Sequence, residues 1–301
     1  MKKLALKLLI SILLIWVIIW KINFNQVVDT VRLVDFKIVP LVILFIALNY
    51  IISSIRWKAL LIHSGGEKAS VGYLTKLYFI GAFFNNFMPT SIGGDAYKVY
   101  KLGSKIGNTS DAFTATFMER FTGVVALTLI SLVSLMGILG YNGVLLFLAF
   151  WAFVLVSFLV LKKVILVKTD STILGKAIGI LARVYDSFMK YKGNFKVLVW
   201  ALFTSFLVQL MAVGSQYFVF RSIGVNLPIV YSLFAFPFIF LAGYAIPSLN
   251  GLGVQDALYI QMFGAAGISV STALSASILY HFFRLTVSLV GGVLYAAGKA
   301  D

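Results

Sequence analysis

The sequence contains no cysteine, so it can form no disulfide and offers no thiolate as a nucleophile or metal ligand. Only two histidines are present among 301 residues, and they leave none of the usual metal-site spacings. Gly-x-Ser-x-Gly, His-Glu-x-x-His and P-loop motifs are also missing. We therefore expect no catalytic residue, no metal and no cofactor, and we favour a protein that is not an enzyme.

Charge is scarce as well, since only 12% of the residues are charged and 61% are hydrophobic. With a mean hydropathy of +1.00, this composition is typical of a polytopic membrane protein. The net charge of +15 does not indicate a nucleic-acid partner, because the basic residues gather between apolar runs. That distribution follows the positive-inside rule and predicts cytoplasmic N- and C-termini.

About six apolar runs are long enough to cross a membrane as helices. They cover residues 4–20, 38–62, 111–136, 144–161, 197–220 and 270–297. The first run has a basic start like a signal peptide, but its apolar stretch is long and no cleavage site follows, so we expect a retained span. Near the end of the second run, Arg56 and Lys58 are expected to snorkel to the interface.

Two further apolar runs are interrupted by proline, glycine and polar residues, in the same order in each half of the chain. The first interruption contains Asn85, Asn86, Pro89, Thr90, Ser91, Gly93, Gly94 and Asp95, followed by Lys98. The second contains Pro247, Ser248, Asn250, Gly251, Gly253, Gln255 and Asp256. Irregular backbone at membrane depth is tolerated only where it is buried in protein or lines a watery cavity. Interrupted segments in matching positions of two halves point to a transporter's binding site.

We therefore predict an all-α polytopic fold in which two re-entrant helical hairpins, residues 71–107 and 229–267, belong to an inverted repeat. Residues 1–161 form the first membrane half and residues 197–301 the second. The basic stretch 162–196 between them is expected to be a cytoplasmic interfacial helix that attracts anionic lipid, or a solvated linker. An eight-span description, in which each hairpin arm crosses the membrane, is the alternative topology.

Three charged residues follow the interrupted segments within apolar helices: Glu119, Arg120 and Arg284. Charges at this depth are costly, so each is a candidate functional residue. We expect Glu119 to pair with Arg284 and to leave Arg120 for an anionic ligand. A buried ion network that only holds the repeats together is the alternative. Lys98 is expected at the cytoplasmic mouth of the cavity.

The last apolar run carries a polar stripe at Ser277, His281, Arg284 and Ser288, whose spacing places these residues on one helix face. We expect this face to point into the helix bundle. His281 is a candidate proton relay or phosphate donor, and the alternative is a residue that only packs and hydrogen bonds. For the Asn and Ser residues of the interruptions, capping of the hairpin turns is the alternative to ligand binding.

The segment from Asn85 to Asp95 with Glu119 and Arg120, and the segment from Pro247 to Asp256 with Arg284, resemble the flippase-like transmembrane family. That family includes the membrane region of lysylphosphatidylglycerol synthases and the UPF0104 membrane proteins. The resemblance implies an integral protein of the cell inner membrane and, for the synthase branch, a flippase that moves an aminoacylated phospholipid between leaflets. This chain ends at Asp301 without a soluble aminoacyl-transfer domain, so we expect no lipid synthesis. Family members often carry Glu at these two positions. Asp95 and Asp256 of this chain keep the charge, but the aspartate side chain is shorter.

The leading hypothesis is a lipid flippase or scramblase whose cavity between the hairpins passes a polar headgroup. In it, Arg120 and Arg284 hold a phosphate, while Glu119, Asp95 and Asp256 hold a cationic part or a coupled proton. The expected partners are membrane lipids with anionic or phosphate-bearing headgroups; a second copy of the chain and a separate lipid-modifying enzyme are further candidates. A secondary transporter of a small anion, and a membrane enzyme acting on a lipid-linked sugar or phosphate, are the rival hypotheses.

Overall fold

The computed structural model describes residues 24–61, 69–87, 93–150, 152, 189–245 and 251–298, and the elements in these ranges are α-helices. The expected first span, residues 153–161 of the expected fourth span and residues 162–188 of the linker 162–196 lie outside the described residues. So do six predicted site residues of the hairpin turns, namely Pro89, Thr90, Ser91, Pro247, Ser248 and Asn250.

Four described helices are long and apolar enough to cross a membrane: α3 (Val39–Leu60), α6 (Thr109–Leu139), α9 (Phe195–Ser222) and α12 (Val270–Ala296). Each coincides with a span expected from the sequence to within a few residues. A short helix, α2 (Phe24–Arg32), precedes α3. After α6, a shorter apolar helix over Tyr141–Phe150 falls in the region of the expected fourth span.

The two interrupted segments are pairs of antiparallel helices. The first pair is α4 (Val71–Phe87) with α5 (Gly93–Ile106), and the second is α10 (Ile229–Ala245) with α11 (Val254–Ala265). The Tyr73 hydroxyl donates to the Lys101 carbonyl, and the Tyr231 hydroxyl donates to the Met262 carbonyl in the same place of the second pair. At 1.5 Å per residue, α5 and α11 rise about 21 and 18 Å, less than the hydrocarbon thickness of about 30 Å. These arms are therefore too short to cross, as a re-entrant hairpin requires.

Small residues let the two arms of each hairpin approach closely near the turn. A Cβ at Gly94 would lie 2.0 Å from the Gly81 carbonyl oxygen, and the Gly94 N–H donates to Asn85 Oδ1 at 2.8 Å. In the second hairpin the arrangement is reversed: the glycine, Gly243, lies on the first arm, α10, and the amide comes from the second arm, α11, where the Gln255 side chain packs against Gly243. Both hairpins thus need an amide on one arm and a glycine on the other.

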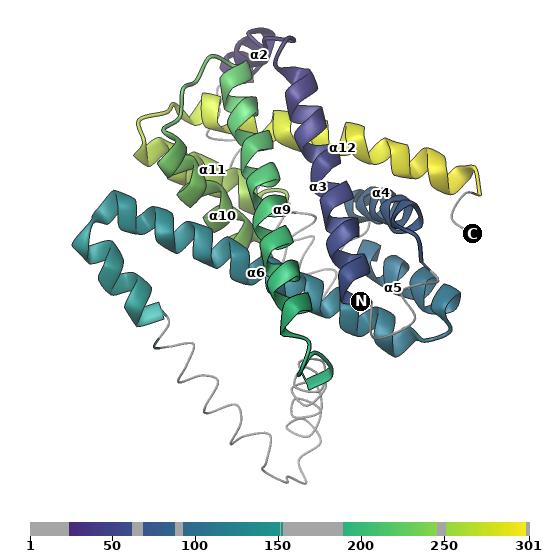
Figure 1. The fold of residues 1–301 in the computed structure, drawn as a ribbon. Helices are drawn as coiled ribbons and strands as arrows, with labels where there is room; N and C mark the ends of the chain where they lie inside the picture. Colours follow the sequence, from purple (N-terminus) through teal and green to yellow (C-terminus); the bar gives the residue numbers. More distant parts are fainter. Residues whose placement is uncertain are drawn as a thin grey trace, which may run out of the picture.

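The long helices α3 and α9 cross as an antiparallel pair at the centre of the molecule (Figure 1). The Asp35 N–H before α3 donates to the Ser222 carbonyl at the end of α9, at 2.7 Å. At the other end, the Tyr191 hydroxyl before α9 donates to the Leu60 carbonyl at the end of α3. Since α4 follows α3 and α10 follows α9, the two hairpins start at opposite ends of this central pair.

Each hairpin packs on the long helix of the other half (Figure 1). Helix α4 lies against α12, where a Cβ at Gly291 would be 2.0 Å from the Phe79 carbonyl oxygen. Helix α10 lies against α6, where Ser131 Oγ approaches the Phe234 carbonyl. Within each half, α5 packs on α6 and α11 packs on α12. The halves are therefore related by a pseudo-two-fold axis across the α3 and α9 pair, which makes the fold an inverted repeat.

Candidate functional site

A cavity of about 910 Å³ lies between α3, α4, α5, α6 and α9, and it is completed by Phe240 of α10 and by Tyr280 and Arg284 of α12. Its volume falls at the upper end of the range that is usual for small-molecule sites. One face of α6 lines it with Phe113, Phe117, Arg120, Val124 and Leu127, at the three- and four-residue spacing of a helix. The cavity therefore lies inside the helix bundle and draws on both halves of the repeat.

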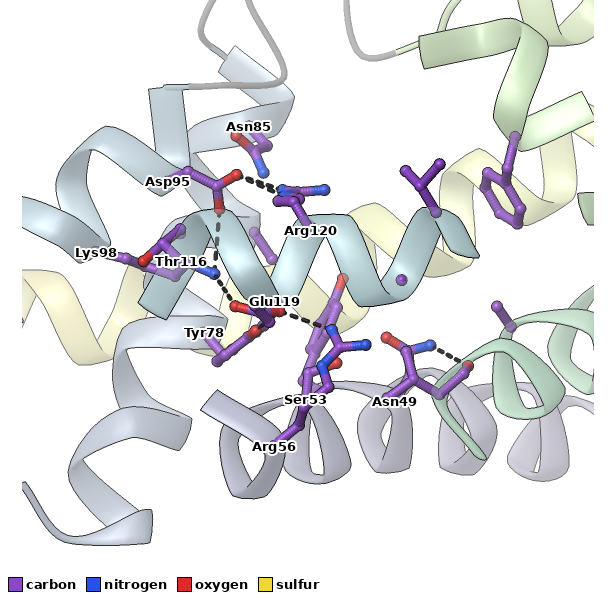
Figure 2. Close-up of a pocket in the computed structure, with 18 of the residues that line it drawn as sticks. Asn49, Ser53, Arg56, Tyr78, Asn85, Asp95, Lys98, Thr116, Glu119 and Arg120 are labelled. Atoms are coloured by element: carbon purple, nitrogen blue, oxygen red, sulfur yellow. Dashed lines mark hydrogen bonds and ion pairs between the residues drawn. The ribbon is translucent and has the colours of Figure 1, made fainter. Parts of the chain in front are cut away.

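Five alternating charges run along one wall of the cavity, from Arg120 through Asp95, Lys98 and Glu119 to Arg56 (Figure 2). Asp95 Oδ2 accepts from Arg120 at 2.6 and 2.7 Å, and Asp95 Oδ1 lies 3.1 Å from Lys98 Nζ. Lys98 Nζ lies 3.7 Å from Glu119 Oε2, and Arg56 donates to Glu119 Oε1 at 2.8 Å. This row of charges joins three helices. Arg56 comes from α3, Asp95 and Lys98 come from α5, and Glu119 and Arg120 come from α6.

The inner part of this network is buried, with Arg56, Lys98 and Glu119 each exposed by 3–4%. The Tyr78 hydroxyl donates to Glu119, and Arg56 also donates to Ser205 Oγ at 2.8 Å. The Lys98 ammonium also lies 3.8 Å from the ring centroid of Tyr78, a cation–π contact. The cost of burying several charges is offset because each has an opposite charge or a hydrogen-bonding partner close by.

The lining carries a surplus of positive charge. Among the described residues that line the cavity, Arg56, Lys98, Arg120 and Arg284 are cationic and only Asp95 and Glu119 are anionic. Arg284 projects from α12, where its guanidinium carbon lies 5.6 Å from the centroid of the Tyr280 ring. A cavity whose lining carries excess positive charge attracts an anionic group.

Four expectations about these charges are wrong. Arg120 is not left without a protein partner, because it holds Asp95, and the partners of Glu119 are Arg56, Tyr78 and Lys98 in place of Arg284. Arg56 does not snorkel to the interface but turns inward to Glu119, since the carboxylate offers a stronger partner than a distant headgroup layer. Lys98 is likewise buried between two carboxylates and does not lie at a mouth of the cavity.

The predicted residues of the second hairpin form a separate polar cluster. Asp256 Oδ2 accepts from the Gly253 N–H at 2.8 Å, Oδ1 accepts from Ser277 Oγ at 2.5 Å, and His281 Nε2 lies 3.4 Å from Oδ1. Among the residues that the structure describes, no member of α11 lines the cavity. Gly251, Gly253, Gln255, Asp256 and His281 therefore form a cluster that does not line the cavity. The predicted residues that do line it are Asn85, Asn86, Asp95, Lys98, Glu119, Arg120 and Arg284.

The polar stripe on the last helix points inward as expected. Ser277 and Ser288 are fully buried. The Ser277 hydroxyl donates to Asp256, and the Ser288 hydroxyl accepts from Asn86 Nδ2 at 2.7 Å. Arg284 reaches the cavity between them. Along this one face, α12 thus touches the second-half cluster, the cavity and the tip of the first hairpin in turn.

Several residues of α5 and α6 that line the cavity are also exposed at the surface. The lining residues Tyr100, Phe113 and Val124 are exposed by 69%, 51% and 41%, and the side chain of Arg120 is 43% exposed. Phe113 and Val124 lie on α6, which is long and apolar enough to span a membrane, so these exposed apolar side chains are placed to meet lipid. The exposed part of the lining therefore consists of apolar residues with one arginine among them.

This architecture defines a multi-pass α-helical membrane protein, built as an inverted repeat around a charged cavity. The sequence model of the family described as the lysylphosphatidylglycerol synthase TM region matches residues 4–292, and the chain belongs to that family. It is also similar to a UPF0104 membrane protein of Pyrococcus horikoshii, with 22% identity over 98% of this chain and 96% of the relative.

Proposed function

We propose that this protein is a lipid flippase or scramblase that passes the polar headgroup of a phospholipid or lipid-linked molecule through the cavity. The observation that carries the proposal is a cation-rich cavity whose lining includes the exposed residues Tyr100, Phe113 and Val124, which we interpret as a sideways opening to lipid. A headgroup inside the cavity can keep its acyl or polyprenyl tails in the bilayer only if the cavity opens sideways to lipid. A transporter of a small soluble anion needs no such opening.

In this proposal, Arg120 and Arg284 bind the phosphate of the headgroup. Guanidinium groups suit phosphate because their planar donors match its oxygens in pairs. Arg120 lies at the opening and Arg284 comes from the other half of the repeat, so a phosphate held by both bridges the two halves. Asp95 has the role of holding Arg120 in place before the lipid arrives.

The test is leaflet exchange of fluorescent phospholipids and of a polyprenyl phosphate in proteoliposomes, with wild type, Arg120→Gln and Arg284→Gln. Each substitution removes charge-assisted hydrogen bonds, and we expect exchange to slow by about tenfold to a hundredfold. Arg221→Gln is the matched control, because Arg221 is an exposed arginine of α9 that bonds Asn226 away from the cavity.

Exchange that survives both cavity substitutions at the wild-type rate would remove the two arginines from the mechanism. If no lipid exchanges while the folded protein transports phosphate or another soluble anion, the secondary-transporter hypothesis replaces ours. Chemical conversion of a labelled lipid without any change of leaflet would favour a membrane enzyme instead.

A further inference from the structure

The inverted repeat places Asp256 and His281 in the positions that Asp95 and Arg120 occupy in the first half. Each aspartate lies in the first turn of the second hairpin arm, Asp95 on α5 and Asp256 on α11. Each partner lies on the following long helix at the same spacing of 25 residues. The helices start alike too, because Asn108 caps α6 and Ser269 caps α12 through the same type of side-chain hydrogen bond.

The two pairs differ in the chemistry of the cation. An arginine is charged at any physiological pH, whereas histidine gains or loses its proton between about pH 5 and 8. Arg120 contacts Asp95 at 2.6 Å, but His281 Nε2 stays 3.4 Å from Asp256 Oδ1 and has no hydrogen-bond partner within the described part of the chain. The side chains of Asp256 and His281 are only 10% and 15% exposed. This is a carboxylate and an imidazole placed to share one added proton.

Most of the described groups around this pair are uncharged, so they leave it able to bind a proton. From α11, Tyr259 lies beside Asp256 and bonds the neutral Gln216 of α9. On α12 itself, the neighbours are Tyr280, whose ring lies 6.3 Å from the imidazole, and Arg284.

The other elements packed on α12 add few titratable groups near the pair. Helix α3 adds Tyr50 beside Arg284, and α4 contacts α12 through Asn86, Phe79 and Phe83. Helix α10 brings Phe240 to Tyr280, and the charges of α2, Asp29 and Arg32, pair with each other at the surface. Asp256 is thus the acid that faces His281, and Arg284 is the nearest cation on its helix face.

We propose that the Asp256 and His281 pair is a proton-binding site that couples movement of an anionic headgroup to proton binding. This inference rests on the proposed function. His281 and Arg284 are three residues apart on one face of α12, so their side chains are neighbours. A proton on His281 and a phosphate on Arg284 attract each other across this turn. By linkage, binding of either strengthens binding of the other by the same factor.

The proton site is tested without any transport assay, because the chain has only two histidines. In a His63→Gln background, His281 is the single histidine, and the NMR signals of its labelled imidazole in nanodiscs report its protonation directly. We expect the signals to follow a single protonation step, whose midpoint the experiment measures. Asp256→Asn should move that midpoint to lower pH, because the variant removes the anion that stabilises the imidazolium. An imidazole that does not titrate between pH 4 and 9, or one that Asp256→Asn leaves unmoved, would overturn the site.

The coupling is tested in nanodiscs that contain zwitterionic lipid alone or zwitterionic lipid with an anionic phospholipid. The anionic lipid should move the midpoint of His281 to higher pH, and Arg284→Gln should abolish that shift. An equal midpoint in the two lipid mixtures would refute the coupling.

In proteoliposomes, His281→Arg fixes a positive charge on the second-half pair, as Arg120 does in the first half, and it should make leaflet exchange independent of pH between about pH 5 and 8. Exchange by wild type that is equally fast across this range would refute the coupling as well. If no lipid is exchanged at all, the proposed function fails while the NMR titration still decides whether the proton site exists.

Discussion

Glu119 is the residue on which most of the buried charge depends. It is 3% exposed, and its carboxylate meets Arg56, Tyr78 and Lys98, which come from three other helices. Removal of one member of a buried ion pair leaves the other charge without compensation, which usually costs more than the pair contributes. Glu119 therefore fixes α3, α4 and α5 around α6, whatever ligand the cavity holds.

Glu119→Gln should lower the free energy of unfolding by about 3–5 kcal/mol, because Arg56 loses its buried counter-charge. Thermal unfolding in detergent measures this loss. Asp29→Asn is the control, since Asp29 pairs with Arg32 at the surface and such pairs contribute about 1 kcal/mol or less. A second variant that adds Arg56→Met to Glu119→Gln should recover part of the stability. Equal losses in the Glu119 and Asp29 variants would contradict this account.

The residues that sequence reasoning identified and missed differ in how local their signal is. Glu119 and Arg120 were predictable because a charge inside an apolar run stands out by itself. Arg56 was misread, because near the end of such a run a basic residue usually serves as an interfacial anchor and its partner is 63 residues away. Tyr78 carries no signal at all, since tyrosine is common in apolar helices. Partners could not be predicted, because pairing depends on how helices pack.

At the scale of the element, apolar length and interruption predicted the helices well. The ends of α3, α6, α9 and α12 lie within a few residues of the expected spans, because long apolar runs bounded by polar residues leave little choice. The hairpin arms were predictable from the proline and glycine interruptions. Their close contact was not, because it depends on Gly81 facing Gly94 across the hairpin.

Gly94→Ala should destabilise the first hairpin by about 1–3 kcal/mol, since the new methyl group would overlap the Gly81 carbonyl and displace the hydrogen bond to Asn85. Gly72→Ala is the matched control, because Gly72 lies at the start of α4, where the added methyl group would meet no atom within 4 Å apart from its chain neighbours and the backbone of its own helix. There we expect no loss, or a gain of up to about 1 kcal/mol from helix propensity. Thermal unfolding compares the two variants, and a similar loss in both would show that hairpin contact is unimportant.

At the scale of the whole molecule, the pseudo-two-fold axis fixes the orientation of the halves. The hairpins start at opposite ends of the central α3 and α9 pair, so the segments that follow them should face opposite sides of the membrane. The basic residues around the first hairpin predict that its ends lie in the cytoplasm. The similar order of residues in the two interrupted segments indicated a repeat. The packing of α4 and α10 on the long helix of the other half could not be predicted, because neither segment alone carries a signal for it.

Single cysteines report this orientation cleanly, because the chain has none of its own. Ser110 lies in the first turn of α6, just after the first hairpin, and Ala266 lies between α11 and α12, just after the second; both residues are exposed. In intact cells, a membrane-impermeant maleimide should label Ala266→Cys and not Ser110→Cys. In inside-out vesicles the pattern should be reversed. Labelling of both positions from the same side would contradict the inverted repeat.

The packing of each hairpin on the long helix of the other half also has a consequence for biosynthesis. When the ribosome has made the first half, α4 has no α12 beside it and α6 has no α10, although Glu119 and its partners are already in the membrane. The first half must therefore wait in the bilayer with part of its polar surface uncovered until the second half is inserted. Only then do Asn86 and Ser288 meet, which makes the last helix the step that completes the assembly.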